Sequence, residues 1–267
     1  MTKPRIFLVT NLANESTEDT EVLGPALRQW FEVTLLNPAD AAPRLKEVDL
    51  CLIRNAWPER EMKHDLRKLA AAVRASGVPS YNPVRANSFA EDKTYLARLT
   101  NDGLPVIPTV LDKADAGRLG KPARYLIKPL DGCGSEGIQK LDAAGVAVVD
   151  LAGNVLQPLI EIARELSFFF IDDTFVYALR TKTGRWDLES WTPDAAELAF
   201  AKQFVDWNKM PYGLQRIDVA LQPDGTMLLL EIEDFSPFLS LQILLADLRA
   251  RVIEALAQSV LRRAKAA

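Results

Sequence analysis

The chain has a single histidine, His64, among its 267 residues, and this scarcity excludes several kinds of catalysis. A serine–histidine triad, a histidine-ligated zinc site and a histidine general base all need imidazole groups that this sequence does not supply. His64 itself lies in a charged stretch with helical periodicity, so we expect it on a solvated helix face. Neither cysteine has a histidine near it in sequence, so a cysteine nucleophile has little support.

Cysteines, long apolar runs and clusters of basic residues are also scarce. Two cysteines, Cys51 and Cys133, make no disulfide framework, so we expect a reducing, cytoplasmic location. No apolar run approaches membrane-spanning length, and the N-terminus MTKPRIFLVTN has no signal-peptide pattern. The net charge of −4, without a basic tail, argues against nucleic acid as a partner. We expect no membrane partner either.

The first 83 residues alternate strand and helix patterns. Apolar content of 48% is ordinary for a globular protein. Short apolar runs predict strands at 6–9, 33–36, 50–53 and 78–81, and helical periodicity predicts helices at 21–31 and 61–75. This alternation predicts a small α/β layer with a parallel sheet.

The pattern after residue 83 predicts an α+β region. Ser88 and Glu91 form a capping-box pattern for a helix that ends near Gly103. A polar connector is expected at 110–123, and the segment from Asp142 to Gly145 is expected to be a turn. Strands are predicted at 105–109, 125–128, 138–141, 154–160, 166–171 and 175–180, and helices at 194–207 and about 241–263.

Three carboxylates near the C-terminus form the most informative pattern. Apolar strands at 217–221 and 227–232 flank the turn signal Pro223-Asp224-Gly225, which predicts a hairpin with Asp218 near Glu231. Period-2 geometry places Glu231 and Glu233 on one side of their strand. Burying these groups without a cation would be costly, and oxygen ligands favour Mg²⁺ carrying a phosphate. The alternative is three solvated acids on an exposed face.

A glycine-rich loop lies within YLIKPLDGCGSEGIQKL and contains Gly132, Gly134 and Gly137. A dinucleotide site would need a helix directly after the loop, whereas 138–141 reads as a strand. A kinase loop would need its lysine downstream and a catalytic histidine. Backbone N–H groups beside Lys128 can still bind phosphate oxygens. The alternative is a flexible hairpin tip with an incidental lysine.

The order of these elements resembles the ATP-grasp superfamily over about residues 82–240. SFAEDK resembles the helix that carries the first nucleotide lysine, Lys93, and LPVIPT resembles the strand after it. Lys128-Pro129 resembles the second lysine motif, LQPLI the hinge, and Glu165-Leu166-Ser167 the ribose-binding element. QRIDV and LEIEDFSP resemble the D-alanine–D-alanine ligase region with a phosphate-facing arginine and the metal carboxylates.

This resemblance implies ATP and Mg²⁺ as cofactors, with Mn²⁺ possible, and it assigns a role to most candidate residues. The fold would be an α/β plus α+β ATP-grasp fold, with a parallel-sheet pre-ATP-grasp domain at 1–83, a small lobe at 84–155 and a C-terminal lobe at 156–267. Phosphates would contact Lys93, Lys128 and the loop with Gly132, Gly134 and Ser135, and Arg180 and Arg216 would also face them. Gln157 and Leu159 would hold the adenine, and Glu165 would bind the ribose. Asp218, Glu231 and Glu233 would bind the metal.

Residues 48–58, VDLCLIRNAWP, are similar to ATP-grasp enzymes of the cycloserine-biosynthesis type. Arg54 and Trp57 follow a strand end, where ligands of α/β proteins bind, so Arg54 is predicted to bind a substrate carboxylate. The alternative is a surface arginine. Ser236 is a further substrate candidate.

Two departures from the ligase pattern stand out. Glu231-x-Glu233 replaces the usual Glu-x-Asn, and a second carboxylate can still ligate Mg²⁺. Ser236-Pro237-Phe238 replaces Ser-Pro-Gly, which puts the geometry of the acceptor substrate in doubt.

The resemblance implies a ligase that joins a carboxylate to an amine through an acyl-phosphate, with ADP as product. Such an enzyme positions its substrates and stabilises charge, and it needs no covalent nucleophile. Cyclisation within one molecule and a homodimer are both open. The rival functions are a nucleotide-binding regulatory module without ligation and an ATP-grasp phosphotransferase.

Overall fold

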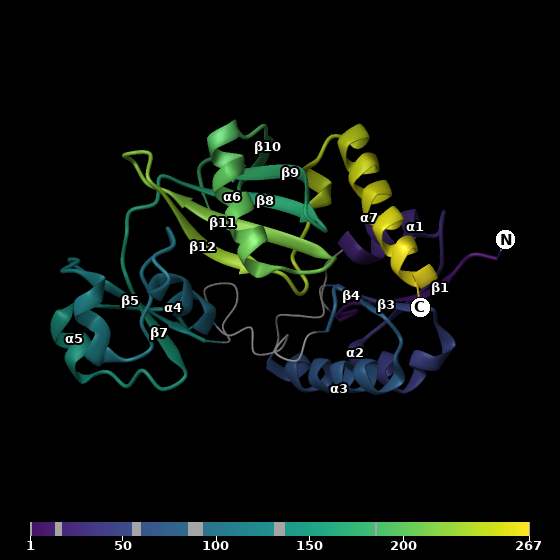
Figure 1. The fold of residues 1–267 in the computed structure, drawn as a ribbon, viewed down its shortest axis with the longest axis horizontal. Coiled ribbons are helices and arrows are strands. Elements are labelled where there is room, and N and C mark those ends of the chain that lie inside the picture. Colours follow the sequence, from purple (N-terminus) through teal and green to yellow (C-terminus); the bar gives the residue numbers. More distant parts are fainter. Residues whose placement is uncertain are drawn as a thin grey trace. The chain divides into compact units, whose positions relative to one another are not determined.

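The computed structural model describes residues 2–13, 18–54, 60–84, 93–130, 137–184 and 186–266 (Figure 1). The chain divides into two compact units, which we call unit 1 and unit 2. Unit 1 comprises Met1–Ala86, Ser167–Ile217 and Ile232–Ala267, and unit 2 comprises Asn87–Leu166 and Asp218–Glu231. Three strands, β8 (Arg164–Ile171), β11 (Leu214–Leu221) and β12 (Met227–Glu233), run from one unit into the other.

A parallel sheet in unit 1 confirms the predicted α/β layer. Its strand order is β2-β1-β3-β4, with each neighbouring pair parallel. The strands are β1 (Arg5–Val9), β2 (Glu32–Leu36), β3 (Leu50–Ile53) and β4 (Ser80–Tyr81). The connections carry a π-helical turn (Glu18–Leu23), α1 (Gly24–Leu27), α2 (Pro38–Ala41), a 3₁₀ helix (Ala42–Glu47) and α3 (Arg60–Ser76). His64 is exposed on α3, as predicted.

The other elements of unit 1 lie later in the chain. They are β9 (Thr174–Thr181), β10 (Leu188–Trp191), α6 (Ala195–Asn208), a 3₁₀ turn (Leu241–Ile243) and α7 (Ala246–Ala266). β10 pairs with β9 at the edge of a five-stranded sheet of order β10-β9-β8-β11-β12. Asp194 and Glu197 form a capping box at the start of α6, which fixes where this helix begins.

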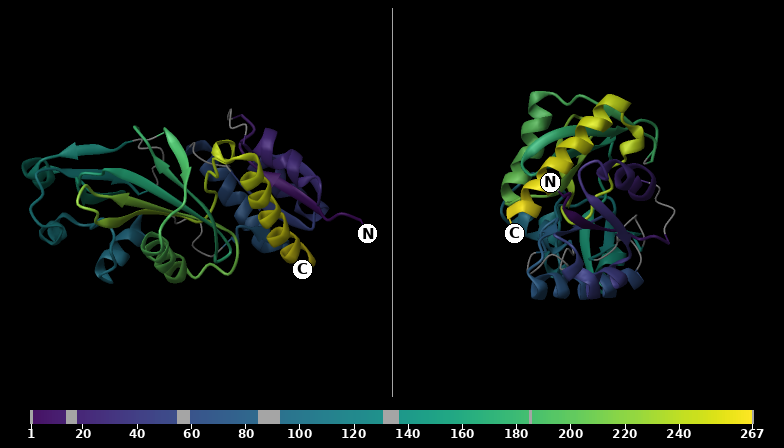
Figure 2. Two further views of the ribbon diagram at one scale, coloured as in Figure 1. Left: turned by 90° about the horizontal axis from the view of Figure 1, so that it is seen from above. Right: turned by 90° about the vertical axis from the view of Figure 1, so that its right-hand side faces the viewer.

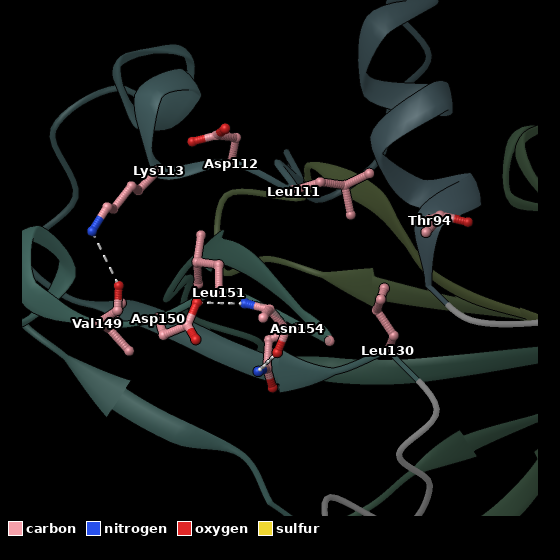
Figure 3. Close-up of a pocket in the computed structure, with 11 residues that line it drawn as sticks. Thr94, Leu111, Asp112, Lys113, Leu130, Val149, Asp150, Leu151 and Asn154 are labelled. Atoms are coloured by element: carbon pink, nitrogen blue, oxygen red, sulfur yellow. Dashed lines mark hydrogen bonds between the residues drawn. The ribbon is translucent and has the colours of Figure 1, made fainter.

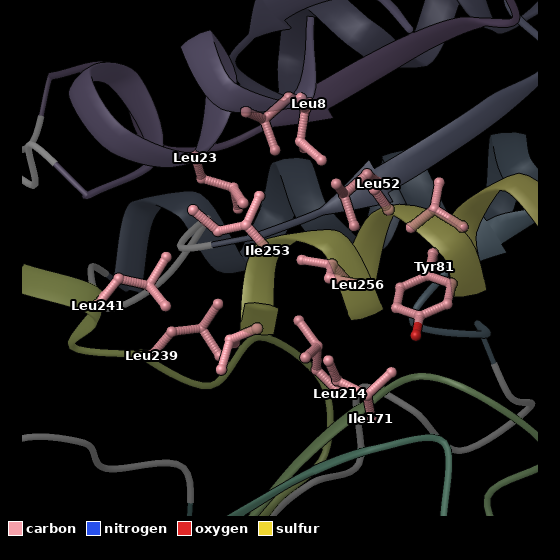
Figure 4. Packing of buried hydrophobic residues seen from close by; sticks show 14 of the residues in the cluster. Leu8, Leu23, Leu52, Tyr81, Ile171, Leu214, Leu239, Leu241, Ile253 and Leu256 are labelled. Carbon is pink, nitrogen blue, oxygen red and sulfur yellow. The ribbon is translucent and has the colours of Figure 1, made fainter. Parts of the chain in front are cut away.

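Helix α7 supplies the apolar layer at the centre of unit 1. It lies beside the parallel sheet and α1 in both views (Figure 2). Ile253 and Leu256 point from α7 into a cluster that contains Leu8 and Leu52 from the parallel sheet and Leu214 from β11 (Figure 4). Because this face of the sheet is covered by a helix from the far end of the chain, unit 1 needs its C-terminal segment in order to bury its core.

Unit 2 is built on a small antiparallel sheet of order β6-β5-β7. Its elements are α4 (Thr94–Asn101), a 3₁₀ helix (Lys113–Leu119), β5 (Tyr125–Pro129), β6 (Gln139–Leu141), α5 (Ala143–Val148) and β7 (Asn154–Pro158). Ile127 and Leu156 lie opposite each other on β5 and β7 and belong to a compact apolar cluster with Val110 and Leu119.

Unit 2 also has an open pocket of about 360 Å³ between the start of α4, Leu130 and the 149–154 segment (Figure 3). Lys113 lies at its rim, with Nζ 3.4 Å from the carbonyl oxygen of Val149. None of the described residues that line the pocket is a predicted site residue. Among the helices that the structure describes, none is long and apolar enough to cross a membrane.

Several predicted elements were wrong in type or extent. The 105–109 strand is reduced to a single bridge at Val106, because Pro105 and Pro108 have no N–H to donate. The turn at Asp142–Gly145 is the capped start of α5, where the Asp142 side chain accepts from the Gly145 N–H. β10 was missed. Regular helix in the 21–31 region ends at Leu27, and the last helix starts at Ala246 after a separate 3₁₀ turn.

Asn82 joins two distant parts of unit 1 through its side chain. Its Nδ2 donates to the carbonyl oxygens of Leu214 and Asp234, both at 2.7 Å, and its Oδ1 accepts from the Leu214 N–H at 2.6 Å. Asn82 is 1% exposed, so water cannot replace these bonds.

We predict that Asn82→Ala lowers the free energy of unfolding by about 2–4 kcal/mol, because two buried backbone groups and one partly buried group lose their partner. Urea denaturation followed by circular dichroism measures this loss. Asn101→Ala, at the exposed end of α4, is the control and should change stability by less than about 0.5 kcal/mol. Equal stability of the two variants would contradict this role for Asn82.

Candidate functional site

Lys93 is placed in unit 2 at the start of α4 by a backbone bond and an ion pair. Its N–H donates to the carbonyl oxygen of Leu130 at 3.0 Å, directly after β5. Its Nζ lies 3.2 Å from Oε1 of Glu231 on β12, and the two side chains are 12% and 31% exposed. The structure therefore brings together the first predicted nucleotide lysine and one predicted metal carboxylate. It also ties Lys93 to the strand that leads into the glycine loop.

The glycine loop connects two antiparallel strands. β5 and β6 pair antiparallel with Tyr125 opposite Leu141, and the first regular element described after the glycine-rich segment is the strand β6 rather than a helix, as predicted. Lys128 is half-buried on β5, opposite Val155. Gly132, Gly134 and Ser135 lie outside the described residues.

Gln157 is a fully buried polar side chain on β7 with one unsatisfied atom. Its Nε2 donates to Thr109 Oγ1 at 2.8 Å, and that hydroxyl donates to the carbonyl oxygen of Ile107 at 2.8 Å. The Oε1 atom of Gln157 is buried and has no hydrogen-bond partner in the described part of the chain. A buried acceptor without a donor is unfavourable by about 1–3 kcal/mol, so a donor from a bound molecule would be favoured there.

Two other predicted nucleotide-binding residues, Leu159 and Glu165, follow Gln157 closely in sequence. The Leu159 N–H already donates to the carbonyl oxygen of Arg124 at 2.9 Å, so it is engaged within unit 2. Glu165 is half-buried on β8.

The predicted carboxylate hairpin is formed around the expected turn. Gln222 N–H donates to the Thr226 carbonyl, and Gly225 has φ of +87°, which suits glycine. Asp218 on β11 is 8% exposed, so the interpretation as three solvated acids does not hold for it. Glu231 and Glu233 are two residues apart on β12, so they lie on the same side of that strand. Among the described residues, no group of three or more Asp, Glu, His or Cys side chains is close enough to hold a metal ion.

Arg216 in unit 1 makes both an ion pair and a backbone bond. Its Nη2 lies 3.7 Å from Oε1 of Glu233, and its Nη1 donates to the carbonyl oxygen of Phe238 at 3.3 Å. Arg216 therefore forms a salt bridge with one of the three predicted metal carboxylates. The Arg216 side chain is 19% exposed, so part of it is still accessible to solvent.

Arg180 pairs with Glu189 across the β9–β10 ladder, with 2.8 Å between Nε and Oε1. The sequence did not predict this partner because β10 was not recognised. The role of Arg180 beside phosphates stays a prediction.

Arg54 is buried completely, so the alternative reading of a surface arginine was wrong. Its Nε donates to Asp19 Oδ1 and its Nη2 to Glu18 Oε1, both at 3.2 Å. Its Nη1 donates to the carbonyl oxygen of Pro237 at 2.8 Å. Arg54 and Asp19 are 0% exposed and Glu18 is 3% exposed. Each of the three guanidinium nitrogens of Arg54 therefore donates a hydrogen bond to an acceptor within the protein.

The partners of Arg54 were missed in the sequence because they stand in the acidic stretch NESTEDTE, which reads as solvated. The apolar residues that follow at Val22 and Leu23 were the available signal that this stretch enters the core. Ser236 is half-buried after β12. Trp57, the other substrate candidate, lies outside the described residues.

The chain has measurable similarity to several known proteins, although no family model matches it. The cycloserine biosynthesis protein DcsG of Streptomyces lavendulae is 28% identical, over 69% of this chain and 74% of DcsG. The crystal structure of D-cycloserine synthetase DcsG matches with a TM-score of 0.75 at 22% identity, covering 95% of this chain and 99% of that one.

Two further solved structures share the fold at lower identity. The ATP-grasp ligase PsnB, complexed with a precursor variant, Mg and ADP, has a TM-score of 0.66 at 17% identity and covers 97% and 98% of the two chains. D-alanine–D-alanine ligase from Bacillus anthracis, complexed with ATP, has a TM-score of 0.69 at 14% identity and covers 99% of both. The chain therefore has the ATP-grasp fold, and the fold class predicted from its sequence is confirmed.

We predict that Arg54→Met lowers the free energy of unfolding by about 3–5 kcal/mol, because it leaves two buried carboxylates without their cation. Urea denaturation at pH 7 measures the effect. Arg44→Met is the matched control, since Arg44 also pairs with a glutamate, Glu47, but is 43% exposed. If Arg54→Met lowers the free energy of unfolding by no more than about 1 kcal/mol, the buried ion pairs of Arg54 are not important for stability and the prediction is wrong.

Proposed function

We propose that this ATP-grasp protein is an ATP-dependent, ADP-forming ligase that joins a carboxylate to an amine through an acyl-phosphate. The observation that carries the proposal is the ion pair between Lys93 and Glu231, which join α4, the glycine-loop strand and the carboxylate hairpin. The similarity to DcsG and to two ligases of amino acids and peptides supports the same reaction class. The substrates we propose are small amino acids, peptides or related metabolites.

The polar groups of unit 2 fit an adenine nucleotide. The unsatisfied Oε1 of Gln157 can accept a hydrogen bond from the exocyclic amino group of adenine. Lys93 at the start of α4 and Lys128 on β5 supply positive charge for phosphates. Glu165 would accept from ribose hydroxyls.

The donor chemistry at the hairpin fits Mg²⁺, a hard cation that prefers oxygen ligands. Asp218, Glu231 and Glu233 are the residues that we propose to hold it. Because no three such groups lie close enough together among the described residues, binding would have to bring these carboxylates closer, and the ion would then neutralise charge on the phosphates. Glu231 now faces Lys93, so Lys93 would turn from the carboxylate toward a phosphate oxygen as the nucleotide binds.

Arg216 would stabilise the phosphoryl group as it passes to the substrate carboxylate. Its ion pair with Glu233 and its bond to Phe238 hold the guanidinium in place before reaction. Fixed donors of this kind contribute a few kcal/mol to lowering the barrier, since no reorganisation is needed during the reaction. Attack by the amine on the acyl-phosphate then releases phosphate and forms the C–N bond. Arg180 is proposed to assist near the phosphates, and the division into domains at 1–83, 84–155 and 156–267 is part of this proposal.

We predict that the pure protein with Mg²⁺-ATP releases ADP and phosphate when the correct acid and amine are added. The test is a panel of amino acids, dipeptides and aminooxy acids, with mass spectrometry of the products. A product lighter by one water than its components, formed with ADP, supports ligation. A phosphorylated product that accumulates, or nucleotide binding with no turnover across the panel, would oppose it.

Glu231→Gln should lower the turnover number by about 100-fold or more, because one charged oxygen ligand is lost. Glu47→Gln, which removes a carboxylate from an exposed pair, is the control and should keep full activity. Equal turnover in the two variants would exclude Glu231 from the reaction.

Gln157→Leu should weaken ATP binding about tenfold while stability changes by less than about 1 kcal/mol, because the replaced side chain has an unsatisfied acceptor. Isothermal titration calorimetry and thermal unfolding check the two parts. Gln258→Leu, exposed on α7, is the control. ATP affinity that matches the wild type would contradict the contact with adenine.

A further inference from the structure

The segment 237–241, directly after β12 and Ser236, has its backbone held by side chains from elsewhere in unit 1. Arg54 donates to the Pro237 carbonyl at 2.8 Å, and Arg216 donates to the Phe238 carbonyl at 3.3 Å. The Tyr177 hydroxyl donates to the Leu239 carbonyl. Burial raises the pKa of this hydroxyl well above its usual value, so it remains a donor.

Glu18 holds the same segment through both oxygens of its carboxylate. Oε1 accepts from the Leu239 N–H at 3.0 Å, and Oε2 accepts from the Leu241 N–H at 2.8 Å. Arg54 binds the same Oε1 at 3.2 Å. Arg54 and Glu18 therefore form a buried ion pair that contacts the segment near both of its ends.

The segment has no glycine, yet Ser240 has φ of +53°, a left-handed conformation that non-glycine residues adopt rarely. The bonds to Glu18 flank this residue and support its conformation. The shape of the segment is thus imposed by side chains from the residue directly after β3, from β9 and β11, and from the π-helical turn.

Phe238 is the exception to burial within this fixed segment. Leu239 and Leu241 are 1% and 0% exposed and belong to the core, whereas Phe238 is 43% exposed. Figure 4 shows Leu239 and Leu241 pointing into that core. A single exposed aromatic is ordinary on a protein surface. Here, however, its own carbonyl is bound by Arg216, the residue proposed to face the transferred phosphoryl group.

We propose that Phe238 contacts the apolar part of the acceptor substrate and thereby selects it, and that Arg54 and Glu18 are positioning residues that fix the 237–241 segment for this contact. The proposal rests on the proposed ligase function, because it uses Arg216 to place the segment beside the reacting groups. Arg54 acts through the segment, since it is fully buried and its donors are bound to Glu18, Asp19 and Pro237.

Hydrogen exchange tests the positioning part without any enzyme activity. In the wild-type protein the Leu239 and Leu241 amides should be protected, and Glu18→Gln should speed their exchange about tenfold or more. Glu47→Gln is the matched control, because Glu47 lies in an exposed pair far along the chain from this segment. Unchanged exchange at both amides in Glu18→Gln would overturn this part.

Steady-state kinetics with the acid–amine pair that gives the highest ADP release in the panel tests the substrate contact. Phe238→Ala should raise the KM for the acceptor amine about tenfold and leave the KM for ATP unchanged. Leu245→Ala, which is 80% exposed a few residues later, is the control and should leave both KM values unchanged. Glu18→Gln should raise the KM for the amine in the same direction, whereas a purely structural role would leave both KM values of the folded enzyme unchanged.

Two results separate this proposal from the proposed function. If the wild type ligates a pair and Phe238→Ala keeps the wild-type KM and preference across the amine panel, the substrate contact is refuted and the ligase function stands. If no pair is ligated, the ligase function fails and the contact with an acceptor substrate fails with it, while the exchange experiment still decides whether Glu18 fixes the segment.

Discussion

The complete burial of the Arg54 guanidinium is the constraint on which much of unit 1 depends. Removing such a charge from water is costly unless carboxylates and carbonyl oxygens satisfy it in good geometry. Glu18 and Asp19 meet this need from a helical turn 36 and 35 residues earlier in sequence, and Pro237 meets it from 183 residues later. These segments must therefore come together in one arrangement for the charge to be tolerated. We expect this cluster to contribute more to the specificity of the fold than to its net stability.

The ion pairs made by Arg54, Lys93 and Arg216 differ in exposure, and the difference suits different tasks. Arg54 with Glu18 and Asp19 is excluded from water, so these groups keep their partners. Lys93–Glu231 and Arg216–Glu233 are partly exposed, and pairs of this kind are worth about 1 kcal/mol or less. In the proposed reaction, a phosphate or a metal ion would therefore displace the partner at little cost. The buried pair can fix a backbone while the two exposed pairs remain available to ligands.

Local sequence patterns predicted those parts of the fold that depend on local signals. The parallel sheet followed from alternating apolar runs and helices, and the hairpin with Asp218 and Glu231 followed from Pro223-Asp224-Gly225 between two apolar strands. The order of lysines, glycine loop and carboxylates was enough to predict the ATP-grasp fold, which the solved structures confirm. The predicted roles of the individual site residues remain untested by these similarities.

What the sequence did not reveal depends on contacts between distant residues. Nothing near Arg54 indicates that its charge is matched by Glu18 and Asp19, because charge pairing at a separation of 35 residues leaves no local pattern. Strand β10 was missed in the sequence for the same reason, because Glu189 pairs with Arg180 only when β10 lies beside β9. α5 was read as a turn because Asp142 and Gly145 favour turns, although the same Asp142 side chain also caps a short helix.

The replacement of a glycine by Phe238 changes how the segment after β12 obtains its shape. A glycine can adopt unusual backbone conformations by itself, whereas a segment of larger residues needs external partners to hold one. Here Glu18, Arg54, Arg216 and Tyr177 supply those partners, so the conformation is fixed without glycine. Once the backbone is fixed by other residues, the side chain at position 238 can be large and can vary without loss of the segment's shape. A position with that freedom, adjacent to the arginine that we propose to face the phosphoryl group, is where substrate preference can change while the chemistry stays the same.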